Sequence, residues 1–245
     1  MADKPEEAAA EEQAEQDKNP FALLFQLEDV ALNGRKTAYE TLEEILRDEK
    51  IKISPPLFSR FCLQAGPDTC IPELLESIGS KKATDAKIPD AFTKQLLTKF
   101  EKISSLPNES LRKVLKAAKD QEITIATVTS LPEESAQKII KRIGLDDLDV
   151  RIFPFKNGDK TIPGPNTWLK TARELEQKPR ACAVIGGSMA ICKSALSADM
   201  RCAAVPDEFT EFQDYSGVDL VLESLADISA NELLETLFPD APEQS

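Results

Sequence analysis

The sequence predicts an α/β protein with a doubly wound parallel sheet, a Rossmann-like core, and an α-helical cap inserted after the first strand. A buried strand comes first, at residues 21–25, and runs directly into a polar turn. Purely helical patterns then extend to about residue 104, and strands alternate with helices from residue 123 onward. Strands separated by helices are typical of a parallel sheet, because each crossover helix packs on a sheet face.

The helical block has no strand pattern, so we expect it to be an all-helical insert. Its first stretch, residues 35–50, places four apolar side chains on one helical face: Ala38, Leu42, Ile45 and Leu46. Three further helical stretches follow, with the sequences PPLFSRFCLQ, CIPELLESIG and AFTKQLLTKFEKI. Prolines separate them, and Pro89 lies where a helix would begin.

The rest of the chain is expected to form the α/β core. After a helix in ESLRKVLKAAKDQ, strands are expected at residues 123–128, 150–155, 181–185, 201–205 and 218–222, and helices at residues 134–144, 166–176, 188–198 and 230–237. The predicted organisation is an acidic disordered tail (1–19), an α/β core (20–34 and 105–238), a helical cap (35–104) and a C-terminal tail (239–245).

The charge balance limits the partners. The chain has 245 residues, with 30 basic and 43 acidic side chains and a net charge of −13. An acidic body without a basic stripe argues against nucleic acid or a membrane surface as the main partner. The N-terminal residues are acidic and alanine-rich, unlike a signal or transit peptide, and no apolar run approaches the ~20 residues that cross a bilayer. We therefore expect a cytoplasmic protein.

The sequence contains no histidine, and its five cysteines have no CxxC spacing. A zinc site is therefore not expected, and every histidine-based acid/base mechanism is excluded. An odd number of cysteines without a secretion signal indicates reduced thiols.

Polar residues follow the first strand in FALLFQLEDV, at the strand end where α/β sheets bind ligands. This stretch resembles the first motif of the haloacid dehalogenase-like (HAD-like) phosphatases, a strand followed by Asp-x-Asp-Gly-Thr/Val. The resemblance implies that the first Asp is the nucleophile and the second the general acid/base. Here Gln26 has the place of the nucleophile, Glu28 that of the acid/base, and Asp29 that of the glycine.

These substitutions change the chemistry that the resemblance implies. Catalysis in the family proceeds through an aspartyl-phosphate, and the neutral amide oxygen of Gln26 is poorly nucleophilic. Glu28 is one methylene longer than Asp, and a displacement of about 1 Å costs on the order of a hundredfold in rate.

The second and third motifs of the family match in part. ITIATVTSLPEESAQKIIKRIGL resembles the second motif, with Thr127 at the position that binds the phosphoryl group. GDKTIPGPNTWLKTA resembles the third, in which a Lys precedes Pro-x-Pro. Ile162 stands at the Lys position, and Lys160 lies two residues upstream.

The fourth motif resembles ACAVIGGSMAICKSALSADM, with Gly186 and Gly187 where the family has the acids that complete a Mg²⁺ site. Because Mg²⁺ prefers carboxylate oxygens, we expect that site to be lost and no metal or other cofactor to be bound. The candidate anion-binding groups that remain are Thr127, Lys160, Gly186, Gly187 and Ser188.

The resemblance extends from Phe21 to Leu237 and is strongest to the phosphoglycolate phosphatase and β-phosphoglucomutase subgroup with a helical cap. The nucleophile, the Lys and the metal acid are replaced together, which predicts a catalytically inactive member. It would act by binding, as a regulator or scaffold, to a phosphorylated small molecule or a protein partner.

Two alternatives remain open. The first is a phosphatase or phosphomutase for a small phosphorylated metabolite, which requires Glu28 or Asp29 to replace the nucleophile and Lys160 to reach the cleft. The second is a protein-interaction module that uses the apolar residues of the helical block, such as Phe58, Phe61, Phe92 and Phe100, if they form an exposed patch.

Overall fold

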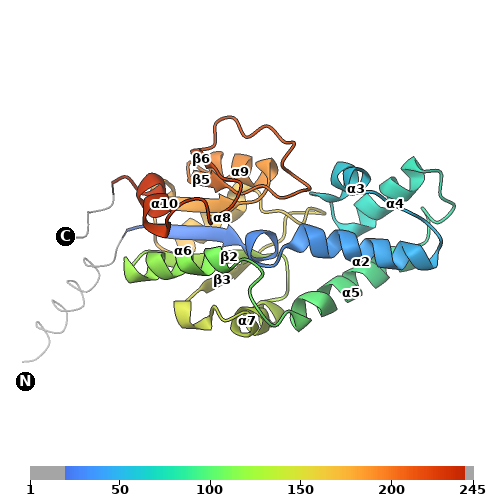
Figure 1. Cartoon of the computed structure of the whole chain (residues 1–245), viewed down its shortest axis with the longest axis horizontal. Coiled ribbons are helices and arrows are strands. Elements are labelled where there is room, and N and C mark those ends of the chain that lie inside the picture. Colours follow the sequence, from blue (N-terminus) through green and yellow to red (C-terminus); the bar gives the residue numbers. More distant parts are fainter. Residues whose placement is uncertain (1–19, 241–245) are drawn as a thin grey trace, which may run out of the picture.

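The computed structural model describes residues 20–240; the predicted acidic tail, and residues 241–245 of the predicted C-terminal tail, lie outside this range. In the described range, six strands form one sheet in the order β3-β2-β1-β4-β5-β6, and all neighbours are parallel (Figure 1). The strands are β1 (Ala22–Gln26), β2 (Thr124–Thr129), β3 (Arg151–Pro154), β4 (Cys182–Gly186), β5 (Arg201–Ala204) and β6 (Leu220–Val221).

Helices connect and cover these strands. They are α2 (Gly34–Asp48), α3 (Pro55–Cys62), α4 (Pro67–Ser77), α5 (Lys87–Lys102), α6 (Glu109–Asp120), α7 (Glu133–Arg142), α8 (Pro165–Glu174), α9 (Met189–Leu196) and α10 (Ala230–Leu237). A π-helical turn, Leu27–Ala31, follows β1 directly, and short 3₁₀ turns lie at Asp146–Leu148 and Pro179–Ala181.

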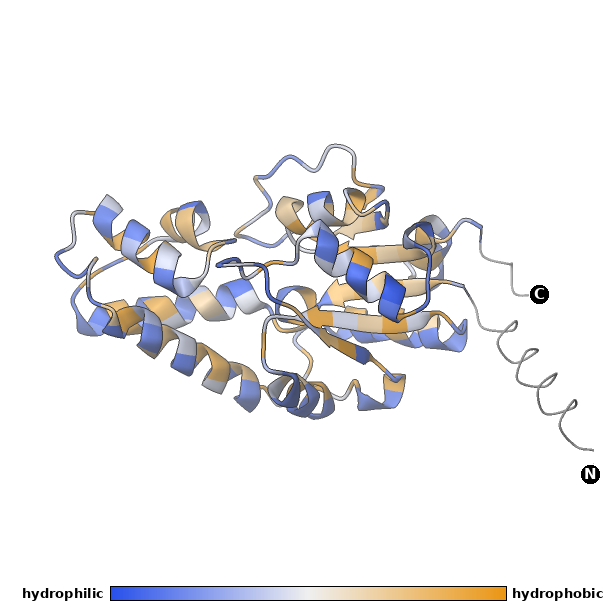
Figure 2. Cartoon of the chain, turned by 180° about the vertical axis from the view of Figure 1, so that it is seen from behind, coloured by the Kyte–Doolittle hydropathy of each residue, from blue (hydrophilic) through white to orange (hydrophobic). Residues whose placement is uncertain are grey.

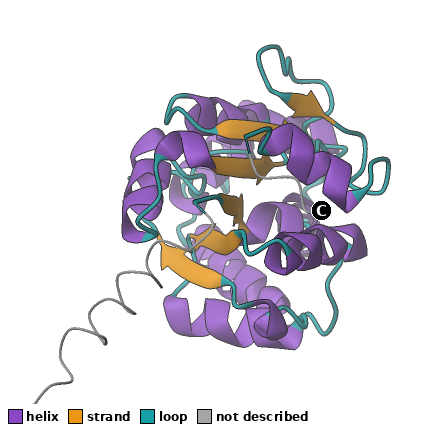
Figure 3. Ribbon diagram, turned by 90° about the vertical axis from the view of Figure 1, so that its left-hand side faces the viewer, coloured by secondary structure: helices purple, strands orange, loops and turns teal. Residues whose placement is uncertain are grey.

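The sheet is covered on both faces, as Figure 3 shows in a view turned by 90°. Alternate residues of β1 point to opposite faces. Leu23 and Phe25 pack with α6, α7 and α10, whereas Ala22 and Leu24 pack with α8 and α9. A strand buried on both faces is apolar throughout, which is why β1 has no polar alternation. The predicted doubly wound α/β fold class is confirmed.

Helices α2–α5 lie beyond the carboxyl end of β1, at the right of Figure 1. They pack around an apolar core of their own, which includes Leu42, Phe58, Leu74 and Phe92. Figure 2 shows the corresponding pattern, with the strands largely hydrophobic and the surrounding helices striped. The helical insert after the first strand is therefore present, and its exact boundaries remain a prediction.

The aromatic side chains of this insert do not form an exposed patch. Phe58, Phe92 and Phe100 are buried, and Phe61 is half-buried. The structure therefore gives no support to the interaction-module hypothesis from these residues. In the described part of the chain, no helix has both the length and the apolar character needed to cross a membrane.

Candidate functional site

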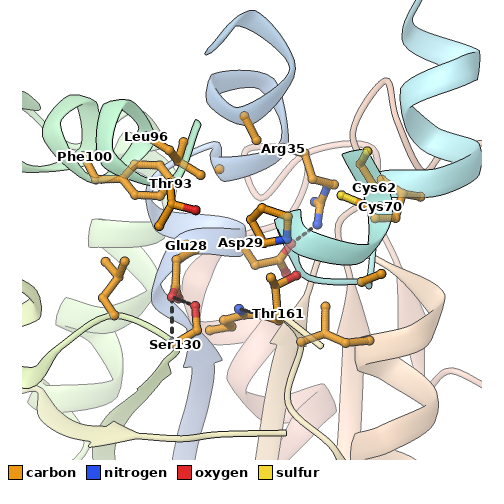
Figure 4. A pocket seen from close by; sticks show the side chains of 18 of the residues that line it. Glu28, Asp29, Arg35, Cys62, Cys70, Thr93, Leu96, Phe100, Ser130 and Thr161 are labelled. Atoms are coloured by element: carbon orange, nitrogen blue, oxygen red, sulfur yellow. Dashed lines mark hydrogen bonds and ion pairs between the residues drawn. The ribbon is translucent and has the colours of Figure 1, made fainter. Parts of the chain in front are cut away.

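A cavity of about 450 Å³ lies where the carboxyl end of β1 meets the cap helices α2–α5 (Figure 4). Its polar end is formed by Gln26, Glu28, Asp29 and Arg35, with Ser130 after β2. The carboxyl ends of the strands are where open α/β sheets place their ligands, and a cavity of this size suits a small molecule.

Gln26 is the last residue of β1, one residue later than the strand end predicted from the sequence. It pairs in register with Val128 of β2, so the ladder holds it in the sheet. Its side chain is buried, and Nε2 donates a hydrogen bond to the carbonyl of Thr161 at 2.8 Å. The amide oxygen Oε1 is buried and has no hydrogen-bond partner among the described residues.

The loop that contains Thr161 also forms a hydrogen bond with the cap. The Thr161 N–H donates to the carbonyl of Gln64, between α3 and α4, at 2.9 Å. Thr161 therefore contacts the nucleophile position of the core and the cap at once.

Glu28 lies in the π-helical turn, with its carboxylate directed to the segment that follows β2 (Figure 4). Its Oε1 accepts three hydrogen bonds, from the Ser130 N–H at 2.7 Å, the Ser130 hydroxyl at 2.6 Å and the Thr129 hydroxyl at 3.0 Å. Burial raises the pKa of Glu28 more than these donors lower it. Its second oxygen, Oε2, is buried without a partner in residues 20–240.

The raised pKa of Glu28 predicts a pH-dependent stability. The folded protein holds this proton more tightly than the unfolded chain, whose pKa is near 4.5, so the contribution of Glu28 is present at low pH. It is lost as the pH rises from about 4.5 through the raised value. We expect unfolding free energies measured between about pH 4 and 8 to show this loss in the parent protein, and Glu28→Gln to remove it.

The matched control is Glu133→Gln, the same change at an exposed position. Its pH profile should follow that of the parent protein. Parallel profiles for the parent protein and Glu28→Gln would contradict the assignment.

Asp29 is part of a buried ion-pair network. Its side chain is 2% exposed, accepts a hydrogen bond from the Gly187 N–H at 2.5 Å and forms an ion pair with Arg35 (Figure 4). Arg35, at the start of α2, also donates from Nε to Asp207 Oδ2 at 2.6 Å. Burial alone would lower the pKa of Arg35, but the two carboxylates outweigh it and raise the pKa. The guanidinium is thus a fixed positive charge between two carboxylates.

Gly187 makes this network sterically possible. A Cβ atom on Gly187 would lie 2.8 Å from Asp29 Oδ1 and closer still to Arg35 Nη2. An acidic side chain at this position, as the fourth motif of the resembled family has, would collide with the network. The position of the Arg35 side chain therefore depends on the absence of a side chain at Gly187.

The residues at this end of the sheet do not fit a Mg²⁺ ion. Gln26 and Gly187 offer no carboxylate, and Asp29 is already paired with Arg35. Mg²⁺ in proteins is usually held by one or two carboxylates together with water, and the Arg35 guanidinium beside Asp29 would repel it. Among the described residues, no three acidic, cysteine or histidine side chains stand together as a metal site would require.

The candidate anion-binding groups are mostly engaged with the protein itself. The buried Thr127 hydroxyl donates to the Phe25 carbonyl at 3.1 Å, and the Gly187 N–H donates to Asp29. Gly186 ends β4 and the buried Ser188 precedes α9, whereas Thr127 lies within β2, on the other side of β1 from β4.

The two candidate residues of the third motif, Lys160 and Ile162, differ in their position relative to the cavity. Lys160 is exposed and is not one of the described residues that line the cavity, whereas Ile162 lines it. The anion-binding role of the group as a whole remains a prediction.

Two cysteines of the cap, Cys62 and Cys70, also line the cavity (Figure 4). A side-chain hydrogen bond with Cys70, together with burial, raises the pKa of the Cys62 thiol. The thiolate is the reactive form, so this environment disfavours Cys62 as a nucleophile.

Sequence reasoning identified Gln26, Glu28 and Gly187 but missed Arg35 and Asp207. A cation six residues after Asp29, at a predicted helix start, was a usable signal for Arg35. Asp207 meets Arg35 across 172 residues of sequence and carries no local motif, so only the fold reveals it.

Comparisons with known proteins agree with this architecture. The family model of the haloacid dehalogenase-like hydrolases matches residues 22–199. A protein of Bacillus subtilis (strain 168), "Putative phosphatase YhcW", is 26% identical over 217 residues, which cover 88% of this chain and 97% of that protein.

Two solved structures share the fold at low sequence identity. One is CbbY from Rhodobacter sphaeroides in complex with phosphate, with a TM-score of 0.68 and 18% identity over 85% of this chain and 96% of that chain. The other is β-phosphoglucomutase (pgmB) from Clostridium difficile, with a TM-score of 0.69 and 18% identity over 89% of this chain and 97% of that chain.

The family match covers most of the chain, including β1 to β4, on which the four motifs lie. The resemblance predicted from the motifs is therefore confirmed. This chain belongs to the haloacid dehalogenase-like hydrolases.

Proposed function

We propose that this chain acts by binding a small molecule in the cavity between its core and its cap, without transferring a phosphoryl group. The observation that carries the proposal is the Arg35 guanidinium, held between Asp29 and Asp207 beside Gly187. It supplies a permanent positive charge next to the position where the resemblance implies a metal-binding acid.

The electrostatics at this end of β1 support the proposal. Phosphoryl transfer to a protein side chain requires an ionised nucleophile that is free to attack. Gln26 is neutral, the Asp29 carboxylate is committed to Arg35 and the Gly187 N–H, and Glu28 Oε1 is held by three donors. A binding role, regulatory or scaffolding, requires none of these groups to react.

The second candidate is a phosphatase or phosphomutase for a small phosphorylated metabolite, and the comparisons favour it. The Bacillus subtilis relative is described as a putative phosphatase, and one of the similar solved structures is a β-phosphoglucomutase. In the structure, the observation in its favour is that both Glu28 and Asp29 line the cavity. One of them would have to leave its present partners to attack phosphorus.

A phosphatase assay separates the two candidates. We expect purified protein with para-nitrophenyl phosphate and Mg²⁺ to release nitrophenol no faster than the buffer does. The comparison set is Asp29→Asn, Glu28→Gln and the exposed control Glu133→Gln. Turnover that survives in the control and disappears in either cavity variant would overturn the proposal in favour of the phosphatase.

A further inference from the structure

We propose that the ligand of this cavity is an apolar molecule with an amine head group, rather than a phosphate ester. This inference rests on the proposed function, because it names the class of molecule that the cavity between core and cap takes.

The walls of the cavity are mainly apolar. Phe58 of α3 lines the cavity, and α5 contributes Phe92, Leu96 and Phe100. Figure 4 shows Leu96 and Phe100 side by side above the polar end. Aromatic and aliphatic walls with few polar groups are typical of sites that bind the apolar body of a small molecule.

The charges argue against an anionic head group. Arg35 is the one basic residue among the described residues that line the cavity, and its guanidinium is committed to Asp29 and Asp207. Glu28 and Asp29 line the same end, so two carboxyl groups lie there with a single guanidinium that is already paired. A phosphate group would need unpaired cations or N–H donors, and these carboxylates would repel it.

Two acceptors at the polar end point to a ligand that donates hydrogen bonds. Gln26 Oε1 and Glu28 Oε2 are the buried side-chain polar atoms without a partner in residues 20–240, and both residues line the cavity. Buried polar atoms are nearly always paired, and an unmade hydrogen bond is destabilising.

An ammonium group satisfies both requirements at once. It donates up to three hydrogen bonds, and its positive charge would stabilise the ionised form of Glu28 against the burial that raises the pKa of this carboxyl. The Glu28 Oε1 is already used by Thr129 and Ser130, so Oε2 remains for the ligand. Gln26 Nε2 donates to the carbonyl of Thr161, so the amide oxygen Oε1 remains to accept a hydrogen bond from the ligand.

The test compares probes that share an aromatic body and differ in their head group: 2-phenylethylamine, 2-phenylethanol and phenyl phosphate. Binding is measured by calorimetry and by the thermal unfolding midpoint, without Mg²⁺ and near neutral pH. A ligand of about ten non-hydrogen atoms is expected to bind with a dissociation constant on the order of 1 mM, so titrations extend to about 10 mM. We expect the amine to bind most tightly and phenyl phosphate not to bind.

Variants locate the binding. Glu28→Gln should weaken the amine about tenfold and leave the weaker binding of 2-phenylethanol nearly unchanged, because only the ion pair is lost. The control Glu133→Gln should change neither. Ala38→Leu, which fills part of the cavity wall, should weaken both probes.

The contrary outcomes are distinguishable from each other. Phenyl phosphate that binds more tightly than the amine and is recovered intact would overturn the inference and leave the proposed function in place. Phenyl phosphate that is hydrolysed would overturn the proposed function itself. Absence of amine binding up to about 10 mM, or equal amine binding in the parent protein and Glu28→Gln, would also overturn the inference.

Discussion

We expect Arg35→Ala to lower the free energy of unfolding by about 3–5 kcal/mol, since it removes one partner of a buried ion pair. The Asp29 side chain is 2% exposed, and its remaining described partner would be the Gly187 N–H. A carboxylate left in that environment must either stay charged without a counter-ion or take up a proton. Urea unfolding followed by circular dichroism, at neutral pH and moderate salt, measures the loss.

Two further variants show that the loss comes from the buried charge. Arg180→Ala removes an arginine whose ion pair with Asp199 is exposed, with side chains 84% and 65% accessible, and should cost far less than Arg35→Ala. Adding Asp29→Asn to Arg35→Ala should recover part of the stability, because a neutral amide needs no counter-ion. A loss for Arg35→Ala as small as that for Arg180→Ala would refute the role assigned to the network.

The fold was predictable from the sequence because its signals are local. Buried strands and amphipathic helices each carry their own periodicity, and the order of strands and helices indicates a parallel sheet. The predicted strand ends were wrong where contacts between distant segments determine how far a strand extends. β1 extends to Gln26 because Val128 of β2 offers a partner. The strand expected at residues 218–222 shortens to Leu220–Val221, a sheet edge with one neighbour.

The candidate site was only half predictable, for the same reason. Gln26, Glu28 and Gly187 occupy positions that the motifs mark in the sequence, so their substitution could be noticed without a structure. The residues that take the place of the lost catalytic groups could not be identified from the sequence. Arg35 and Asp207 act together only because the loop after β5 returns to the end of β1, 172 residues along the chain from the arginine. Sequence analysis thus detects the missing acid, and the structure shows the guanidinium beside its position.

Gly187→Ala should lower the free energy of unfolding by about 2–4 kcal/mol, even though it adds a single methyl group. The backbone of Gly187 lies outside the left-handed region, so alanine can adopt its conformation and no backbone strain is involved. The cost comes from the collision of the new Cβ with Arg35 and Asp29, which are held by each other, by Asp207 and by the Gly187 N–H. Gly164→Ala, whose Cβ meets only the Asn157 side chain at 3.3 Å, is the control and should stay within about 0.5 kcal/mol of the parent protein.

The decisive measurement is the double-mutant cycle of Arg35→Ala and Gly187→Ala. If the methyl group is harmful because it displaces the guanidinium, removing the guanidinium first makes the methyl group nearly harmless. The double variant should then be more stable than the sum of the single losses predicts, by at least about 1 kcal/mol. Additive losses would mean that the two residues act independently. Non-additive losses would instead support the view that the glycine at the fourth motif and the arginine at the start of α2 form one unit, with a built-in cation where a catalytic relative would need an acid.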